Sequence, residues 1–531
     1  MPVKPEFDVV IVGSGPSGIS AAFPLVESGL SVLLVDGGRQ ATLSPPSHAF
    51  LESRRQDADQ WKWMIGEGFH ALQNRDAVSP KLRVPVHGYV FEGFATVNRI
   101  EPQSFVAVGS LAAGGLSNAW GCGVARLSKA EMSAYPFSAA DIEGSYRAVA
   151  QRMGVSGGQA DELSEYFGLD EYSQPPIRMD ALHTDLYDRY KKHRLALGKN
   201  GFRLGRSRVA VLSRDLNGRK ACDLLENCLW GCHRRAMYSA FDELPALQRH
   251  GNFHYESGFV VEGIARNENG WLVEGQRGSQ ERRSVSARKV MLAAGTLATT
   301  RLALQTLKLH QPIPLLSCPT AAFLLWLPRL TGFQRTGAFG LGQLSYAVDI
   351  KDGISAFGST FATTGIMVSE FVRHLPMSRR YGIDLLGVLL SSCLVGNVFL
   401  PGHLTLAKAA LAANGSLTVS GSYSDQVPCL MVEVGKKLRK AYFRMGAVLM
   451  PMSFTVGMPG GDIHYAGTLP MRIAPELGET DTFGELHGAE GMYVVDAACL
   501  PELSEKSHTL TIMANADRIA HYVANTMKSH T

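Results

Sequence analysis

The stretch FDVVIVGSGPSG, residues 7–18, decides the fold of this 531-residue chain. Residues 7–12 are apolar apart from Asp8, which is typical of a central parallel strand. After the glycines, residues 19–28 repeat apolar side chains every three to four positions, so we expect a helix there. Residues 31–35 have the composition of a second buried strand. Together these segments predict a complete βαβ unit and an α/β fold.

The glycines at this strand-to-helix junction have the spacing G-x-G-x-x-G. In that pattern Gly13 permits the tight turn, Gly15 lets the backbone approach a pyrophosphate, and Gly18 lets the helix pack closely on the strand. Asp36 follows the next strand, about 20 residues onward, where a carboxylate can accept hydrogen bonds from a ribose diol. The unit therefore predicts dinucleotide binding. Its N-terminal position favours FAD over NAD, and the sequence has no convincing second unit, so electrons must come from the substrate.

Composition excludes several other classes of protein. Lys and Arg number 52 and Asp and Glu 48, and a net charge of +4 is too weak and dispersed for a nucleic-acid binder. A hydrophobic content of 45% with 19% charged residues excludes a disordered chain. Eight cysteines in this length do not make a secreted disulfide scaffold. We expect a folded chain with a large buried core.

The middle of the chain has a different pattern. Residues 253–295 alternate like antiparallel strands, with a turn at residues 267–270. Residues 310–460 lack βαβ signals, and segments such as 344–350 and 430–434 are strand-like. We therefore expect a second domain built on an antiparallel sheet.

The N-terminus and one apolar stretch bear on location. Only six residues precede the first strand, and they contain no secretory signal, so we expect a cytoplasmic protein. Residues 383–400 are the most lipid-like stretch, but they contain Asp384 and are near the lower length limit for a membrane span. A buried or interface helix is the favoured interpretation, followed by peripheral membrane contact and, last, a true span.

Further motifs resemble those of the glucose–methanol–choline (GMC) flavoprotein oxidoreductases. The stretches that carry the resemblance, beside the N-terminal glycines, are GGLSNAWG at residues 114–121, AAGT at 293–296, HYAGT at 464–468, MYVVD at 492–496 and SHT at 507–509. The resemblance implies a discontinuous FAD-binding domain and an interleaved substrate or cap domain. We expect the FAD-binding domain at residues 1–45, 95–130, 205–310 and 460–531, and the substrate domain with its excursions at 46–94, 131–204 and 311–459.

The resemblance also implies which residues contact the cofactor. Besides the first glycines and Asp36, the expected FAD contacts are Gly114, Gly115, Ser117, Asn118, Val260, Asp496 and Thr509. The glycine-rich loop at residues 114–123 has no histidine that could attach the flavin covalently, so we expect non-covalent FAD.

Two histidines are the catalytic candidates that the resemblance implies. Flavin-dependent alcohol oxidation needs a base within hydrogen-bond reach of the hydroxyl, and histidine titrates in the right range. His464 occupies the family's catalytic position. His508 is the better second candidate, and Ser507 is the alternative substrate-facing residue.

Three cysteines, Cys222, Cys228 and Cys232, are spaced C-x5-C-x3-C. Three thiolates suit an iron–sulfur cluster, or zinc with His233 as a fourth ligand. The spacing resembles the three-iron four-sulfur site of dehydrogenase members of the family, although His233 stands where those members have proline. Reduced cysteines, or one disulfide with a free thiol, are the favoured alternative.

These observations predict FAD-dependent oxidation of a primary or secondary alcohol group on a sugar-like or other polyol substrate. Hydride would pass to flavin N5, a histidine would take the proton, and electrons would continue to O2 or an external acceptor. A lyase on the same scaffold, with no net redox change, is the alternative. The pairing of His464 with His508 argues against a third reading, an electron-transfer module without substrate oxidation.

Overall fold

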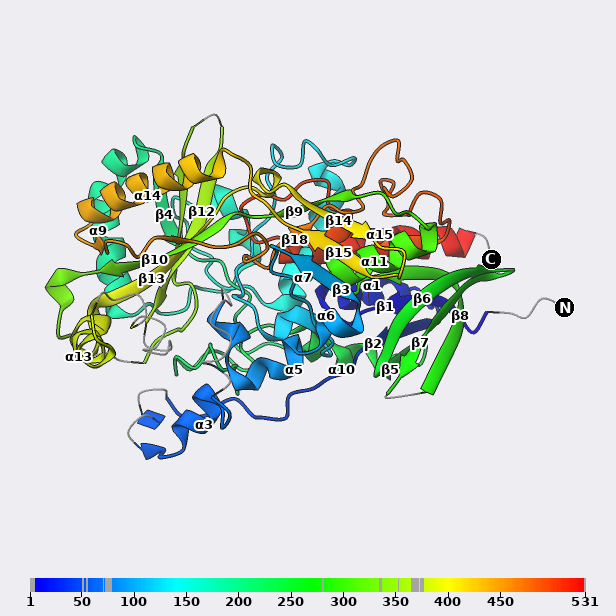
Figure 1. Ribbon diagram of the computed structural model, residues 1–531, viewed down its shortest axis with the longest axis horizontal. Coiled ribbons are helices and arrows are strands. Elements are labelled where there is room, and N and C mark those ends of the chain that lie inside the picture. The colour runs from blue at the N-terminus through cyan, green and yellow to red at the C-terminus, as the bar shows by residue number, and fades with distance from the viewer. Residues whose placement is uncertain are drawn as a thin grey trace.

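The computed structural model describes residues 5–49, 52–53, 56–69, 71, 79–278, 281–333, 337–351, 353–363, 372 and 377–529. The molecule is elongated, with a nucleotide-binding sheet at one end and a second sheet at the other (Figure 1). The α/β class predicted from the sequence is confirmed.

The first sheet grows from the glycine-rich opening of the chain. β1 (Phe7–Val12) pairs in parallel with β2 (Val32–Asp36), and α1 (Pro16–Glu27) connects them. The helix begins at Pro16, earlier than expected, because proline fits the first turn of a helix. β5 (Phe253–Ser257), β8 (Glu281–Leu292) and β19 (Met492–Val494) extend the parallel sheet in the order β5-β2-β1-β8-β19. α15 (Thr509–Ser529) packs on α1 and on α7 (Ala139–Met153).

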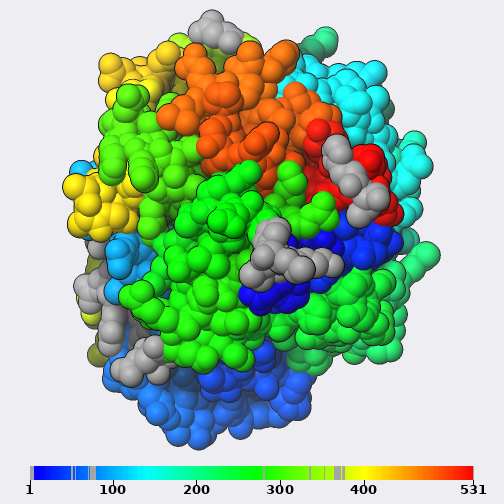
Figure 2. Space-filling view, turned by 90° about the vertical axis from the view of Figure 1, so that its right-hand side faces the viewer, coloured from blue at the N-terminus to red at the C-terminus, as the bar shows by residue number. Residues whose placement is uncertain are grey.

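An antiparallel ribbon continues this sheet. β6 (Phe259–Asn267) and β7 (Gly270–Arg277) form a hairpin that pairs with the first half of β8, so the predicted turn at residues 267–270 is confirmed. Figure 2 shows this end of the molecule, where the green surface of the ribbon adjoins the blue N-terminal and red C-terminal segments.

The second sheet is antiparallel, as expected, in the order β16-β10-β13-β12-β11-β4, with β17 beside β10. Its strands are β4 (Phe202–Arg206), β10 (Thr320–Trp326), β11 (Leu344–Asp349), β12 (Ser355–Ala362), β13 (Cys393–Phe399), β16 (Val448–Leu449) and β17 (Thr455–Val456). One face packs on α9 (Ala181–Gly198) and α14 (Val427–Arg444), and together they enclose a hydrophobic core.

Two predictions about this half were wrong. Residues 430–434 are helical and lie in α14, because Leu430, Met431 and Val434 belong to an apolar face that recurs every three to four residues. Residues 383–400 are not one helix. They contain most of α13 (Arg379–Leu389) and all of β13, whose alternating burial is that of a half-buried strand. No helix among the described residues is long and apolar enough to cross a membrane.

A third sheet joins distant parts of the chain in the order β18-β9-β14-β15-β3. Its strands are β3 (Ile100–Gln103), β9 (Ile313–Ser317), β14 (Ala407–Leu411), β15 (Leu417–Ser420) and β18 (Tyr465–Ala466). α11 (Thr296–Leu307) follows β8, and the short helices are α3 (Gln60–Ile65), α5 (Gly88–Phe91), α6 (Phe94–Val97), α8 (Ser164–Phe167) and α10 (Leu244–Leu247). Because this sheet mixes strands from both predicted domains, the domain boundaries stay a prediction.

Candidate active site

A cavity of about 940 Å³ runs from the β1–α1 turn to the second sheet. One wall includes Gly13 and Gly15 of the opening motif and Gly115 of the second glycine-rich loop. Its far wall includes side chains of β12 and β13. His464, Ser507, His508 and Thr509 lie on its lining as well. The cavity therefore brings together most of the residues that the sequence singled out.

The three glycines of the opening motif have different reasons to be glycine. A Cβ on Gly13 would lie 2.3 Å from the Ala293 carbonyl oxygen, and one on Gly18 would lie 1.9 Å from the Gly13 carbonyl oxygen. These two are dictated by the packing of the chain itself. A Cβ on Gly15 would meet no protein atom within 4 Å, although a Cβ on Gly115 would lie 3.1 Å from the Gly15 Cα. The space beside Gly15 fits a ligand that approaches the backbone.

The N-terminus of α1 lies at the same point. Its first backbone N–H groups have no partner within the helix, and they carry the positive end of the helix dipole. The hydroxyl of Ser17 is buried and has no hydrogen-bond partner in the described part of the chain. A phosphate group would satisfy these donors, so the residues present fit the pyrophosphate of FAD.

Asp36 lies on the cavity lining at the end of β2. Its carboxylate accepts hydrogen bonds from the Ser14 hydroxyl and from the Tyr255 hydroxyl, the latter at 2.9 Å. Burial raises the pKa of Asp36 to about 7. The Ser14 oxygen also accepts from the Gly114 N–H at 2.9 Å, which ties Asp36 to the second glycine-rich loop.

That second loop uses its polar side chains to hold its own shape. The Ser117 hydroxyl donates to the Gly114 carbonyl and accepts from the Ala240 N–H. The Asn118 amide donates to two carbonyls of the loop and accepts from the Ser239 hydroxyl at 2.8 Å. The FAD contacts expected of Ser117 and Asn118 would therefore come from the loop backbone, and they stay a prediction.

The remaining expected FAD contacts also lie on the cavity. Val260 reaches it from β6, and Thr509 begins α15 there. Asp496 follows β19, and its carboxylate accepts from the Gly295 N–H at 3.0 Å and the Thr299 hydroxyl at 2.5 Å. Burial raises the pKa of Asp496 to about 6. Asp496 thus fixes the turn between β8 and α11.

The rings of His464 and His508 lie next to each other on the cavity lining, in an edge-on arrangement. Their ring centroids are 5.0 Å apart with an interplanar angle of 84°, and the Phe399 ring lies 5.2 Å from that of His464. The Nδ1 atom of each histidine is buried and has no hydrogen-bond partner among the described residues. Burial lowers the pKa of His464 to about 4, and burial with the neighbouring His464 lowers that of His508 to about 3. Both imidazoles are therefore neutral near pH 7.

The segment that carries Ser507 and His508 is anchored by the residue before them. The buried Lys506 ammonium donates to the Glu131 carboxylate and to the Tyr166 carbonyl, each at 2.7 Å. Its neighbour Glu505 accepts from the Ser355 hydroxyl at 2.6 Å. These contacts fix His508 at the start of α15, where its carbonyl accepts from the Ile512 N–H.

Cys222, Cys228 and Cys232 lie in an irregular segment, and none of them is in a disulfide. Within the described ranges they are not part of any group of three metal-ligating side chains whose donor atoms lie within 4.8 Å of one another. His233 faces Asp223 instead, at 3.2 Å. This arrangement does not assemble a single zinc site, and the larger iron–sulfur cluster stays a prediction.

Sequence reasoning missed three residues at the site. Lys81 is buried, lines the cavity and donates to the Trp120 carbonyl at 2.5 Å. Asp462 lines the cavity beside His464, and Cys318 lies close to both. No motif marks Lys81 or Cys318. Asp462 stands two residues before His464, which was the one available signal.

Comparisons with known proteins bear on the kind of enzyme. Residues 8–82 match the model of an FAD-binding domain, and residues 460–516 match that of the GMC oxidoreductases, which covers the His464 and His508 segments. The chain is 26% identical to paromamine 6'-oxidase of Streptomyces fradiae, over 99% of this chain and 93% of that protein.

Two solved structures share the fold. Pyridoxine 4-oxidase from Mesorbium loti superposes with a TM-score of 0.60 and a fungal aryl-alcohol oxidase with 0.58, each at 14% identity over 99% of this chain and 100% of the other. Fold, cavity and matches define the class: the chain is an FAD-dependent alcohol oxidoreductase. Its C-terminal segment is similar to that of the glucose–methanol–choline family of flavoproteins.

Proposed function

We propose that this enzyme oxidises the CH–OH group of an uncharged, largely apolar alcohol, with His464 as the base. The observation that carries the proposal is the pair of neutral imidazoles on the lining of a cavity whose far wall is mostly apolar, with Ser359 and Asn397 as its polar members on β12 and β13. When bound, FAD supplies the acceptor for the hydride that leaves the substrate carbon.

His464 suits the role of base because its imidazole is unprotonated at neutral pH. A neutral ring has a lone pair that can take the hydroxyl proton as the carbon-bound hydrogen leaves. His508 lies edge-on to it and can hydrogen-bond the same oxygen, and Ser507 lies on the same lining. Together they would hold the hydroxyl in one orientation, which is a large part of such catalysis.

The wall opposite the nucleotide side favours an apolar substrate body. It is lined by aromatic and thioether side chains, among them Phe357, Phe361, Phe399, Met450, Met452 and Met458. Its acidic member, Asp462, already accepts hydrogen bonds from Ser317 and from the Cys318 N–H. The sugar-like substrate expected from the sequence would find few free polar partners here, so an aromatic or aliphatic alcohol fits better.

A substrate screen tests this proposal. Holoenzyme would be mixed anaerobically with benzyl alcohol, a medium-chain alkanol, pyridoxine, glucose and paromamine, and flavin bleaching would be followed. We expect bleaching by the apolar alcohols at rates well above those for glucose and paromamine. Preference for glucose or paromamine would overturn the apolar assignment. Turnover of an alcohol with no bleaching by any compound would favour the lyase alternative.

The electron acceptor is a separate question for the same enzyme. Peroxide formation in air would mark O2 as the acceptor, and activity with dyes alone would mark a dehydrogenase. Iron analysis of anaerobically purified protein decides whether Cys222, Cys228 and Cys232 hold a cluster. A cluster requires about three irons per chain, whereas reduced thiols give none.

We also propose that the outer face of α13 rests on an anionic lipid surface. Tyr381, Ile383 and Val388 are exposed on this helix at 69%, 52% and 58%. Arg379 and Arg380, also exposed, open the helix, and its Leu386 lines the cavity. Such a helix would lie in the interface and admit an apolar alcohol from the lipid.

Vesicle sedimentation tests the contact with α13. We expect binding to vesicles of phosphatidylcholine with phosphatidylglycerol, weaker binding to phosphatidylcholine alone, and loss of binding in Val388→Glu. The matched control is Val432→Glu on α14, since Val432 is equally exposed at 58%. Equal binding by both variants would overturn this contact.

A further inference from the structure

Cys318, Asp462 and His464 form a cluster of three different metal-ligating side chains. One ligand atom from each lies within 4.8 Å of the other two, and no other such group occurs in the parts of the chain that the structure describes. The fold creates this cluster through one strand pair. β9 pairs antiparallel with β18, with Ser317 opposite Tyr465, so the residue after β9 meets the residues before β18.

The cluster is held in place by its surroundings. The Asp462 carboxylate accepts from the Ser317 hydroxyl at 2.8 Å through one oxygen and from the Cys318 N–H at 2.6 Å through the other. The Cys318 thiol donates weakly to the Ser504 carbonyl at 3.3 Å. The backbone N–H groups of Asp462 and His464 also hydrogen-bond this carboxylate, so a metal ion would replace part of its hydrogen bonding. The His464 Nδ1 is unpartnered among the described residues.

Asp462 and His464 lie just before β18, and the residue between them has an unusual backbone conformation. Ile463 lies between Asp462 and His464 with φ of 60°, in the left-handed region that a β-branched residue rarely adopts. Such strain persists only where the surrounding structure imposes it. Here it accompanies the convergence of both neighbouring side chains on Cys318.

The donor set selects the kind of ion. Sulfur, nitrogen and oxygen donors together suit Zn²⁺, whereas Mg²⁺ and Ca²⁺ take oxygen donors. With zinc bond lengths of about 2.0–2.3 Å, tetrahedral ligands lie about 3.3–3.8 Å apart. The three donors need to close by only about 1 Å to reach that spacing. The fourth position would open to the cavity that Asp462 and His464 line.

We propose that Cys318, Asp462 and His464 form a binding site for Zn²⁺, and that zinc bound there reversibly inhibits the enzyme. Binding replaces the thiol proton of Cys318, which is released to solvent, with a sulfur–zinc bond. It also engages a lone pair of His464 and fills space beside it. Zinc inhibits the reaction only if His464 is the base, so the inhibition rests on the proposed function. The binding of zinc does not depend on it.

Two measurements on holoenzyme test the site. Calorimetric titration with ZnCl2 should show one site per chain, and zinc should inhibit flavin reduction in a manner reversed by a chelator. Cys318→Ser should weaken zinc binding by at least about tenfold, because a thiolate ligand is lost. Inhibition of that variant is compared with its own zinc-free rate.

Control variants separate this site from the other cysteines. Cys429→Ser removes an exposed cysteine on α14 and should leave zinc binding and basal activity unchanged. Loss of zinc binding in Cys228→Ser with retention in Cys318→Ser would overturn the proposal, as would absence of binding to the unmodified enzyme. One-site binding that depends on Cys318 but does not inhibit would support the metal site and count against His464 as the base.

Discussion

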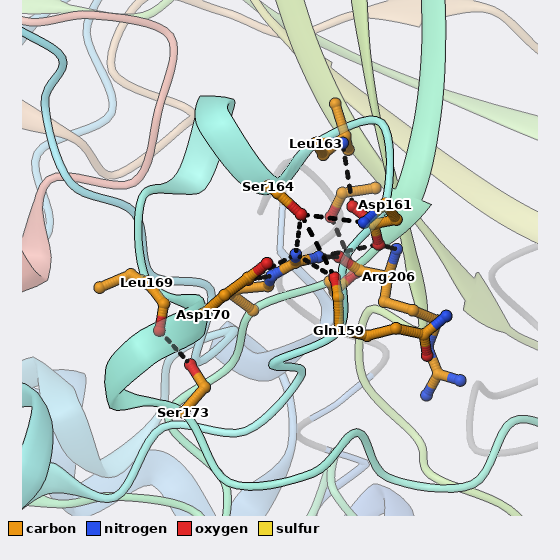
Figure 3. Close-up of polar contacts among 11 residues, drawn as sticks. Gln159, Asp161, Leu163, Ser164, Leu169, Asp170, Ser173 and Arg206 are labelled. Carbon is orange, nitrogen blue, oxygen red and sulfur yellow. Dashed lines mark hydrogen bonds and ion pairs between the residues drawn. The ribbon is translucent and has the colours of Figure 1, made fainter.

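Two polar clusters border the same cavity, and they differ in hydrogen bonding. Acceptors surround the Arg208 side chain, whereas the Nδ1 atoms of His464 and His508 have no partner among the described residues. The Arg208 side chain is fully buried and reaches Asp170 at 2.6 Å, Asp161 at 3.0 Å and the Gln159 carbonyl at 2.9 Å. Figure 3 shows Gln159, Asp161, Ser164 and Asp170 converging within this network. It pins the excursion that contains α8 to the end of β4.

The Nδ1 atoms of His464 and His508 are buried without any such partner in the described part of the chain. Folding normally pairs buried polar groups, because an unpaired one costs about 1–3 kcal/mol. The unpartnered nitrogens of His464 and His508 therefore indicate a place where a ligand completes the network. Other buried polar atoms also lack partners among the described residues, Tyr442 and Tyr238 among them, so the contrast applies to these two clusters on the cavity.

The sharpest test of this difference is His464→Ala. We expect the rate of anaerobic flavin reduction to fall by about 10²–10⁴, the contribution typical of a general base, with FAD still bound and no loss of thermal stability. The matched control is His183→Ala. His183 is a fully buried histidine, and its ring contacts Asp180 at 2.8 Å and the Thr360 carbonyl at 3.2 Å. That variant should lose stability and keep its rate per folded molecule; the opposite pattern would break the comparison.

The second test removes the satisfied cluster. Arg208→Met should lower the free energy of unfolding by roughly 3–5 kcal/mol, because the buried Asp161 carboxylate would keep its charge without its partner. Denaturant unfolding measures the change. A further change of Asp161→Asn in the same chain should restore part of the loss. If Arg208→Met unfolds like the unmodified protein, the network is not what pins the excursion.

The third test uses pH. Because the folded-state pKa of His464 is lowered to about 4, below its ordinary 6.5, the unfolded chain binds a proton between these values that the folded chain does not. Stability should therefore fall as pH drops from about 6.5 to 4, and His464→Ala should reduce that fall. Melting temperatures across this range provide the measurement. An unchanged profile in the variant would show that His464 already ionises in the folded protein.

The smallest expected effect comes from Lys506, a positioning residue for His508. Lys506→Met should slow flavin reduction by less than the ~10²-fold that a 1 Å misplacement can cost, and Lys506→Arg should rescue part of it. The change should appear in the rate at saturating alcohol rather than in the alcohol concentration required. A loss of stability alone, with the rate intact, would give Lys506 a purely structural role.

The sequence could predict features that depend on local backbone needs. Any side chain at Gly13 or Gly18 would put its Cβ within 2.3 Å of a backbone oxygen, so both positions require glycine. Their spacing was therefore enough to predict the βαβ unit. Cofactor contact by Ser117 and Asn118 could not be judged in the same way, because their side chains turn inward to hold the loop. Residues 430–434 do not form the expected strand, because a short apolar run fits a strand as well as a helix. Only the whole of α14 shows the helical repeat.

The approach of Cys318 to His464 could not be predicted at all. It depends on the pairing of β9 with β18, strands about 150 residues apart in the chain, and neither strand has a motif that names its partner. Likewise, the unpartnered state of the histidine nitrogens is a property of the assembled cavity. Local sequence can mark a histidine, but only the fold shows what surrounds it.

The same strand pair has a consequence for how this enzyme could change. β9 ends at Ser317 and β10 begins at Thr320, so only Cys318 and Pro319 separate the strand beside the proposed base from a strand of the substrate wall. An insertion in this link would displace one against the other, because both strands are fixed by pairing. New substrates are therefore easier to accommodate by exchanging side chains on β12 and β13 than by changing chain length. A library confined to those two strands is the natural place to begin altering specificity.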